Sequence, residues 1–319
     1  MLADLFPRER LGRAMAVYAM GIYVGSGLAL LLGALAIRLA EQRSDWVLPL
    51  VGAVHPWQMV FAFVGAPGLL VALAVLALRE PPRRDAPQPM AWPDTIAWLR
   101  AERRFLLHHL FGFGLLSLVA YASAAWIPTA FVRSFGWSAV QAALVLGGMT
   151  TLFSVAGCIA GGWWSDRLAR RGGPAARLRV GAVAGVVLAA CTVAFAAAPD
   201  ALSAAALLAP LCFAVAMPFG ASGAALAERA PPRLRGQASA LSLLVISVVG
   251  IGGGPTAVAL VTEHVLGEPA AVRTAIAAVC AAAGLAGAWL LQRGARLGAG
   301  SAALRLEPAP PAGQHRAPT

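Results

Sequence analysis

Long, uninterrupted runs of apolar residues dominate the pattern along this chain. Eight of these runs reach the length of roughly 18 residues that a helix needs to cross the hydrocarbon core of a membrane. Within lipid, a helix satisfies its backbone hydrogen bonds inside one segment. The pattern therefore predicts eight transmembrane helices, placed near Ala14–Leu39, Trp57–Leu78, Phe105–Phe131, Ser138–Trp164, Val180–Ala198, Ala201–Ala227, Ala238–Thr262 and Thr274–Leu291.

The composition agrees with this pattern. Of 319 residues, 59% are hydrophobic and 12% are charged, whereas soluble domains carry about 25% charged residues. The predicted fold class is an all-α, polytopic helical membrane protein. The four cysteines, Cys158, Cys191, Cys212 and Cys280, lie inside apolar runs without metal-ligand spacing. We expect them to be small buried residues, and we expect no metal, no cofactor and no catalytic residue.

Arginine marks one side of the predicted spans. All 25 basic residues are Arg, and 21 of them fall in connections on the same side. The four on the other side are Arg38, Arg43, Arg133 and Arg273. Because basic residues are retained on the cytoplasmic side, both termini are predicted to be cytoplasmic. Anionic headgroups explain the net charge of +11 without nucleic acid. The Arg, Gly and Ala bias suggests a bacterial inner membrane.

The longest connection divides the chain into two unequal parts. Residues 1–78 hold two spans, and residues 105–292 hold six. The segment between them, 79–104, is Pro-rich, as an extended linker is. It ends in a stretch, Asp94–Arg104, that predicts a short amphipathic helix at the membrane surface. The tail, 293–319, is rich in Ala, Pro and Gly and is predicted to be disordered.

Two turns on the arginine-rich side resemble each other. Ala3–Ala14 aligns without gaps onto Ala227–Ala238 with four of twelve positions identical, and each turn precedes a glycine-rich span. Parallel repeats are typical of transporters built from two related halves. If each half holds six helices, the turns precede the fifth and eleventh, and we expect the first four helices to be absent from this chain.

The ten residues Gly162–Arg171 have the sequence Gly-Trp-Trp-Ser-Asp-Arg-Leu-Ala-Arg-Arg. They resemble the Gly-x-x-x-Asp-Arg-x-Gly-Arg-Arg signature of the major facilitator superfamily, with Ala169 in place of a glycine. The stretches Gly25–Gly27 and Trp126–Phe131 are similar to the spinster-like and organic-anion transporter branches of that family. The resemblance covers nearly the whole chain. It implies two helices from an N-terminal half and a six-helix C-terminal half.

The resemblance also implies a conformational latch. An acidic side chain is stabilised at the N-terminus of a helix, where the helix dipole is positive. We expect Asp166 to take this place at the start of the first span, near Gly12 and Ala14. The predicted members of the latch are Gly162, Asp166, Arg167, Arg170 and Arg171. The alternative is a solvated turn whose arginines only set the topology.

Substrate contacts are expected from the first and fourth helices of each half, of which two remain here. The candidates on them are Tyr121, Ser123, Trp126, Thr129, Phe213, Met217, Phe219 and Ser222. Ordinary packing is the alternative for each. No Asp, Glu or Arg lies in the middle of a predicted span. Either coupling charges lie on the absent helices, or the substrate is amphiphilic and its transport is not coupled to protons.

Two further groups of residues have plainer interpretations. His108 and His109 are placed at the cytoplasmic interface. The glycine pairs Gly21/Gly25, Gly157/Gly161, Gly181/Gly185 and Gly250/Gly254 have four-residue spacing, which favours close helix packing.

The function that follows is secondary transport of a small organic solute or amphiphile by alternating access. Its expected partners are that substrate and the lipid bilayer, with no obligate protein partner. A membrane-embedded enzyme is the rival class, but its clustered polar residues are not apparent. A transport-incompetent remnant, or an interaction partner, is the third possibility.

Overall fold

The computed structural model describes residues 6–7, 10–40, 46–48, 52–77 and 92–304. Eight helices in these ranges are long and apolar enough to cross a membrane, which confirms the predicted number. They are Leu11–Leu39, Gln58–Leu76, Arg103–Phe135, Ala139–Gly172, Pro174–Ala197, Ala201–Arg229, Pro232–Leu266 and Pro269–Leu297. The observed fold class is therefore the polytopic all-α class expected from the apolar runs.

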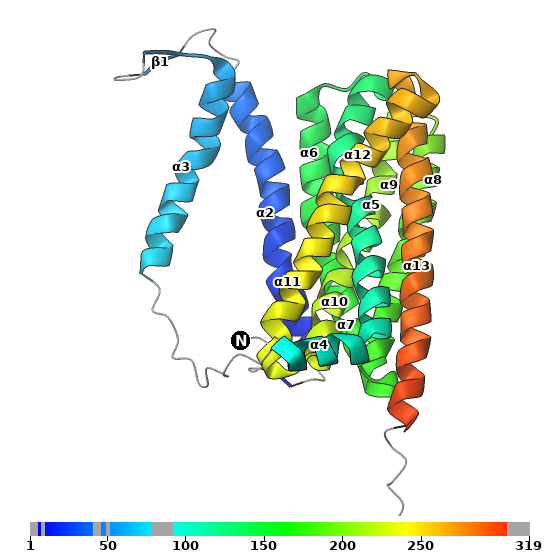
Figure 1. Cartoon of the computed structure of the whole chain (residues 1–319). Coiled ribbons are helices and arrows are strands. Elements are labelled where there is room, and N and C mark those ends of the chain that lie inside the picture. Colours follow the sequence, from blue (N-terminus) through cyan, green and yellow to red (C-terminus); the bar gives the residue numbers. More distant parts are fainter. Residues whose placement is uncertain (1–5, 8–9, 41–45, 49–51, 78–91, 305–319) are drawn as a thin grey trace, which may run out of the picture.

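The N-terminal part is a pair of helices that differ in how they are packed. Helix α2 (Leu11–Ala40) lies along the main bundle, while α3 (Pro56–Leu76) leans away from it (Figure 1). A small antiparallel hairpin precedes α3, formed by β1 (Trp46–Leu48) and β2 (Gly52–Val54). Sequence patterning did not predict these strands, because three residues are too few to show an alternating pattern.

A short helix, α4 (Trp92–Ala101), leads into the second part of the chain. A single residue, Glu102, separates it from α5 (Arg103–Phe135). The predicted surface helix is therefore present but shifted towards the N-terminus, because the bundle helix already includes Arg103 and Arg104. The rest of the predicted linker, up to residue 91, lies outside the described residues.

The main bundle has six spans, of which α5 is the first, and several of the other five are interrupted. One span joins α6 (Ala139–Met149), a π-helical turn η2 (Thr150–Ser154) and α7 (Val155–Gly172). The 3-10 turn η3 (Pro174–Arg177) opens α8 (Leu178–Ala197). Pro218 separates α9 (Ala201–Ala216) from α10 (Pro218–Arg229). The seventh span runs from η4 (Pro232–Leu234) through α11 (Arg235–Val245), η5 (Ile246–Gly252), α12 (Gly253–Leu260) and η6 (Val261–Leu266). The last comprises η7 (Pro269–Ala271) and α13 (Val272–Leu304).

The last helix is longer than expected. The chain from Arg293 was predicted to be a disordered tail, but α13 continues to Leu304. The prolines of the tail begin only at Pro308, so no residue of 293–304 interrupts the helix in the way that Pro would. Residues 305–319 lie outside the described part of the chain.

The core of the main bundle forms where α5, α8 and α13 meet. Phe131, Phe195, Ile276 and Leu291 are almost completely buried there. Glycines bring the helices close: a Cβ added to Gly185 would lie 2.6 Å from the carbonyl oxygen of Gly284. In a membrane, such small residues allow backbones to approach and gain dispersion contacts.

Three of the four predicted glycine pairs lie at helix contacts of this kind. Cβ atoms at Gly157 and Gly161 would meet backbone atoms of Phe213 and Met217, and one at Gly254 would lie 2.6 Å from the carbonyl oxygen of Leu118. Gly21 and Gly25 differ, since no described atom lies within 4 Å of an added Cβ at either.

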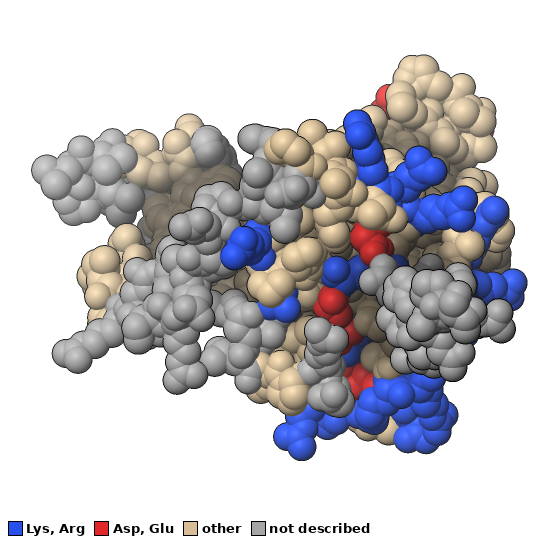
Figure 2. Space-filling view, turned by 60° about the horizontal axis from the view of Figure 1, so that its bottom comes forward, with Lys and Arg blue, Asp and Glu red and all other residues tan. Residues whose placement is uncertain are grey.

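The ends of the bundle differ in charge. We use the term "arginine-rich end" for the end at which α2, α5 and α11 begin and α7 and α10 finish (Figure 1). Figure 2 views this end and shows basic side chains around a small group of acidic ones. This group contains the site described next.

Candidate functional site

Asp166 lies on the last turns of α7 with its side chain fully buried. One carboxylate oxygen, Oδ1, accepts a hydrogen bond of 2.8 Å from the backbone N–H of Gly12. The other, Oδ2, accepts one of 3.1 Å from the N–H of Arg13. These are among the first amides of α2, which have no partner within their own helix. The structure thus places Asp166 where the sequence predicts the latch, on the positive end of the α2 dipole.

Glycines make this close approach possible. A Cβ on Gly12 would lie 2.6 Å from Oδ1 of Asp166, and a Cβ on Gly162 would lie 2.7 Å from Cβ of Ala16. Gly220, on α10, lies equally close, since its added Cβ would be 2.8 Å from the carbonyl oxygen of Gly12. Three helices therefore meet at glycine positions, and Gly220 is a member of the site that sequence reasoning did not identify.

Arg177 connects the two buried carboxylates of the site. Its side chain is completely buried, and its Nη1 donates to Oδ1 of Asp166 at 2.8 Å and to the hydroxyl of Ser165 at 2.9 Å. Its Nη2 donates to Oε1 of Glu228 at 2.6 Å, and the Glu228 side chain is only 4% exposed. The ion pairs thus run from α2 through α7 and η3 to α10.

Arg13 supplies the second cation. Its Nε lies 3.3 Å from Oδ2 of Asp166, and its side chain is 48% exposed. Two arginines and two carboxylates therefore balance one another, because an unpaired buried charge is strongly unfavourable.

The arginines named from the sequence lie elsewhere. Arg167, Arg170 and Arg171 are exposed, and Arg167 lies over the ring of Trp163 at 5.6 Å. A helix turns by about 100° per residue, so Arg167 and Arg171 leave α7 on faces away from Asp166. Within the described part of the chain, Asp166 contacts Arg13 and Arg177 instead.

The repeated turn could have pointed to two of these residues. Arg13 belongs to the repeated turn, and Glu228 occupies the acidic position of its second copy. Arg177 follows Pro174 in the same connection as the signature, but its burial results from the packing of η3 against α7, α10 and α13, which the sequence does not show.

A second ion pair lies next to the first. Nε of Arg229 lies 2.9 Å from Oε2 of Glu102, and the Arg229 guanidinium lies over the ring of Phe105 at 4.8 Å. Neighbouring residues of α10, Glu228 and Arg229, therefore contact Arg177 on one side and the junction of α4 with α5 on the other.

The candidate substrate residues do not all share one environment. Tyr121 and Phe219 are exposed to about the same extent, 40% each. By contrast, Ser123 and Met217 are buried, and Nε1 of Trp126 donates to the carbonyl oxygen of Pro255 at 2.9 Å. Thr129, Phe213 and Ser222 are partly buried.

Tyr23 of α2 adds an aromatic ring to this region. It contacts Phe219 edge to face, with ring centroids 6.3 Å apart. Its hydroxyl donates to the carbonyl oxygen of Val215 at 3.5 Å. Sequence reasoning did not select Tyr23, because it considered only the first and fourth helices of each half.

His109 lies inside the bundle near the start of α5. It is fully buried between Phe105 and Phe113, with ring centroids 5.5 and 4.9 Å away. Its Nε2 donates to the carbonyl oxygen of Ser222 at 3.1 Å. This face of α5 is turned to the bundle interior, whereas His108 contacts the Arg104 carbonyl oxygen near the helix start.

Comparison with known proteins identifies the family. A family model described as Major Facilitator Superfamily matches residues 1–255. The chain belongs to the major facilitator superfamily. In this superfamily member, the sequence signature and the buried Asp166 site occupy the same helix end.

Spinster proteins are among the relatives of this chain, in agreement with the spinster-like branch predicted from the sequence. Protein spinster homolog 1 of Bos taurus and of Homo sapiens are each 30% identical to it over 142 residues. The matched segment is 42% of this chain and 24% of each relative. A solved bacterial homologue of the human lysosomal transporter Spinster, inward-facing and unoccupied, has a TM-score of 0.59 at 21% identity. That match covers 98% of this chain and 75% of the homologue, and it shows a shared fold.

Proposed function

We propose that this chain acts in secondary transport, moving a small organic solute or an amphiphile across a bacterial inner membrane by alternating access. The observation that supports this most directly is the buried carboxylate of Asp166, held between the first amides of α2 and two arginines. This carboxylate joins α2 to the main bundle through ion pairs and hydrogen bonds. The arginine-rich end, with both chain termini, faces the cytoplasm in this proposal.

Such a contact suits a reversible opening. When α2 moves away from α7, Asp166 and Arg13 become accessible to water, and their solvation offsets much of the lost attraction. An apolar contact gains nothing comparable when it opens. The equilibrium between closed and open forms then depends on a difference of a few kcal/mol, which is the range over which a ligand can shift populations.

The residues proposed to contact the substrate are mainly aromatic. Tyr121 and Phe219 are exposed, and Tyr23 lies against Phe219. Ser123, Trp126, Thr129, Phe213, Met217 and Ser222 complete the set proposed from the sequence. A surface of this kind favours an apolar or amphiphilic solute, because aromatic rings supply large contact areas with few charges.

A transport assay with two charge-matched variants tests the proposal. Proteoliposomes are loaded with a bacterial metabolite and lipid extract, and the released compounds are followed by mass spectrometry. The wild-type chain is expected to release at least one compound faster than empty liposomes do. Asp166→Asn should change that rate, since the amide keeps the size but loses the charge that pairs with Arg13 and Arg177.

Asp200→Asn is the control, because Asp200 is an exposed helix cap at the opposite end of the bundle. It should leave release unchanged. Equal release from wild-type and empty liposomes would reject transport by this polypeptide, and equal rates for wild type and Asp166→Asn would reject the latch.

A further inference from the structure

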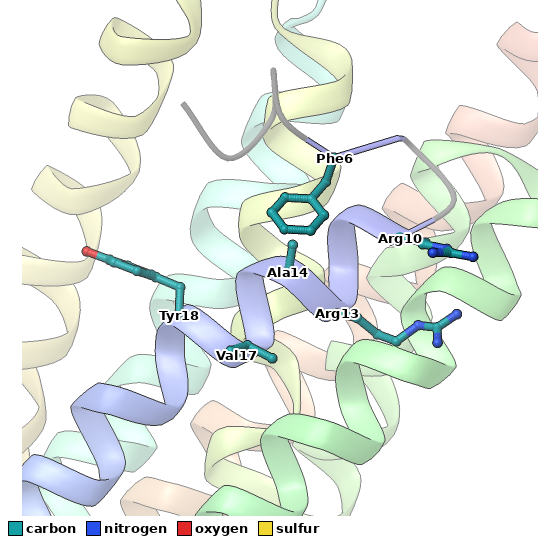
Figure 3. Close-up of a pocket in the computed structure, with 6 residues that line it drawn as sticks. All are labelled: Phe6, Arg10, Arg13, Ala14, Val17 and Tyr18. Atoms are coloured by element: carbon teal, nitrogen blue, oxygen red, sulfur yellow. The ribbon is translucent and has the colours of Figure 1, made fainter. Parts of the chain in front are cut away.

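A groove on the surface of α2 lies beside the latch. It is lined by Phe6, Arg10, Arg13, Ala14, Val17 and Tyr18 (Figure 3). The ring of Phe6 lies over Ala14, and the side chains of Arg10 and Arg13 extend to the same side of the helix. The groove is therefore apolar along most of its length and has two guanidinium groups at one end.

These guanidinium groups have N–H donors that no described residue accepts. Arg13 uses Nε for Asp166, and among the described residues its terminal nitrogens have no hydrogen-bond partner. The side chain of Arg10 likewise has no polar partner in that part of the chain. The acidic side chains Asp166 and Glu228 lie against Arg13 and Arg177, and no described acidic side chain pairs with Arg10.

The groove lies at one end of a helix that is long and apolar enough to cross a membrane. The first span begins at Leu11, so Arg10 and Arg13 lie at its boundary. Val17 is seven residues beyond Arg10, or about 10 Å along a helix that rises 1.5 Å per residue. A molecule with its charge at the arginines and an apolar chain along Val17 and Tyr18 would lie with the polarity of a membrane lipid.

We propose that this groove binds one anionic phospholipid of the leaflet at the arginine-rich end. Arg10 and the terminal nitrogens of Arg13 bind the phosphate, for which the planar guanidinium fork is suited. Phe6, Val17 and Tyr18 contact the acyl chain. A lipid with net charge −1 matches the charge of Arg10, which has no acidic partner among the described residues, whereas a zwitterionic lipid brings a cation of its own.

Binding has a consequence for the latch. Because Nε of Arg13 remains on Asp166 while the terminal nitrogens bind phosphate, the lipid fixes Arg13 in place and favours the closed contact between α2 and α7. This consequence rests on the proposed function, but the lipid site itself does not.

Binding is measured by native mass spectrometry and by the unfolding midpoint in detergent, with phosphatidylglycerol or phosphatidylcholine added. The wild-type chain should retain one phosphatidylglycerol selectively. Arg10→Gln should weaken that binding about tenfold, as expected when one charged hydrogen-bonding group of about 1.4 kcal/mol is removed. Arg170→Gln is the control, because it removes the same charge from an exposed site at the same end.

Three results would overturn the lipid site. Equal weakening by Arg10→Gln and Arg170→Gln would indicate unspecific attraction. Equal retention of both lipids would remove the charge argument, and displacement by inorganic phosphate at equal concentration would indicate a free-anion site. If lipid selectivity is found but proteoliposomes show no transport, the proposed function fails while the lipid site stands.

Discussion

The two ends of the main bundle both hold a shielded arginine, but the partners of these arginines differ. At the arginine-rich end, Arg177 binds two carboxylates, and through Asp166 it connects α2 with the main bundle. At the opposite end, Arg273 of α13 binds the carbonyl oxygens that finish α8, those of Phe195, Ala196 and Ala198. The Arg273 guanidinium also lies 4.6 Å from the ring of Phe135.

Arg177 therefore belongs to a contact between α2 and the six-helix region, whereas Arg273 belongs to a contact within the six-helix region. The groups around Arg273 all belong to the six-helix region, so this arginine stabilises a single unit by satisfying the last carbonyl groups of a helix. Arg177 pairs with two charged groups, and one of them, Asp166, also binds α2 through the backbone N–H groups of Gly12 and Arg13 and the Arg13 side chain. We expect changes at Arg177 to affect both folding stability and the position of α2, and changes at Arg273 to affect stability alone.

The largest effect is expected from Arg177→Gln. This change removes the buried cation that contacts both Asp166 and Glu228, and breaking a buried ion pair typically costs about 3 kcal/mol or more. The unfolding midpoint in detergent should fall clearly. A thiol-reactive dye measures it directly, because Cys158, Cys191, Cys212 and Cys280 are all buried.

Arg171→Gln is the matched control, since Arg171 is exposed at the same end, and its midpoint should stay within the error of the wild type. If both variants unfolded at the same temperature, the ion pairs of Arg177 would contribute nothing to stability. The comparison between the two ends would then lose its basis.

A smaller effect is expected from Gly12→Ala. The added methyl group would lie 2.6 Å from Oδ1 of Asp166 and 2.8 Å from Nη1 of Arg177. Overpacking of this kind costs about 1–3 kcal/mol, and moving α2 outward is the simplest relief. Cys158 measures this movement, because it is buried against Ala16 and Ala19 of α2. Its alkylation should become faster.

The second copy of the repeated turn supplies the control. Gly236 aligns with Gly12 in sequence, but no described atom lies within 4 Å of an added Cβ there. Gly236→Ala should leave Cys158 alkylation unchanged, and the midpoint should stay or rise, because Ala favours a helix by up to about 1 kcal/mol over Gly. Equal effects at both glycines would show that the two turns are equivalent.

These two glycines also show how far sequence reasoning reaches. The apolar runs predicted the number of spans, because lipid requires long apolar helices whatever their neighbours are. The signature likewise predicted the place of Asp166. The repeat made Gly12 and Gly236 look alike, however, and only the packing of α7 and α10 on α2 distinguishes them.

Side-chain direction accounts for most of what the sequence did not predict. Arg167, Arg170 and Arg171 were chosen for closeness in sequence to Asp166, but η3 instead brings Arg177 to the carboxylate. His109 was placed at the interface from its position near the start of a span, yet α5 turns it towards Ser222. Which face of an apolar helix contacts another helix is not visible when all of its faces are apolar.

At the opposite end, Arg273→Gln should have a modest effect. It removes a cation from the end of α8, an interaction worth about 1 kcal/mol in partly buried positions, although the amide can still donate to one carbonyl oxygen. The midpoint should fall by less than in Arg177→Gln, and Cys158 should react at the wild-type rate. Faster alkylation of Cys158 in this variant would show that α2 responds to both ends.

The smallest effect is expected at Asp200, also at the end opposite the arginines. Its carboxylate accepts hydrogen bonds from the backbone N–H groups of Leu202 and Ser203, each at 2.9 Å. The bond from Ser203 is the main reason that the pKa of Asp200 is lowered from its ordinary value of 3.8, with that from Leu202 contributing. Since the charged form is favoured in the folded chain, this stabilisation is present above the ordinary pKa and is lost as the pH falls through the lowered one.

The difference between wild type and Asp200→Asn should therefore depend on pH. An asparagine caps a helix without titrating, so the wild-type midpoint should exceed that of the variant near neutral pH, and the gap should close as the solution is acidified below the ordinary pKa. At any given pH, Cys158 should be alkylated at the same rate in wild type and variant, because the cap joins no part of α2. A gap that stays constant with pH would mean that the carboxylate charge of Asp200 does not stabilise the cap.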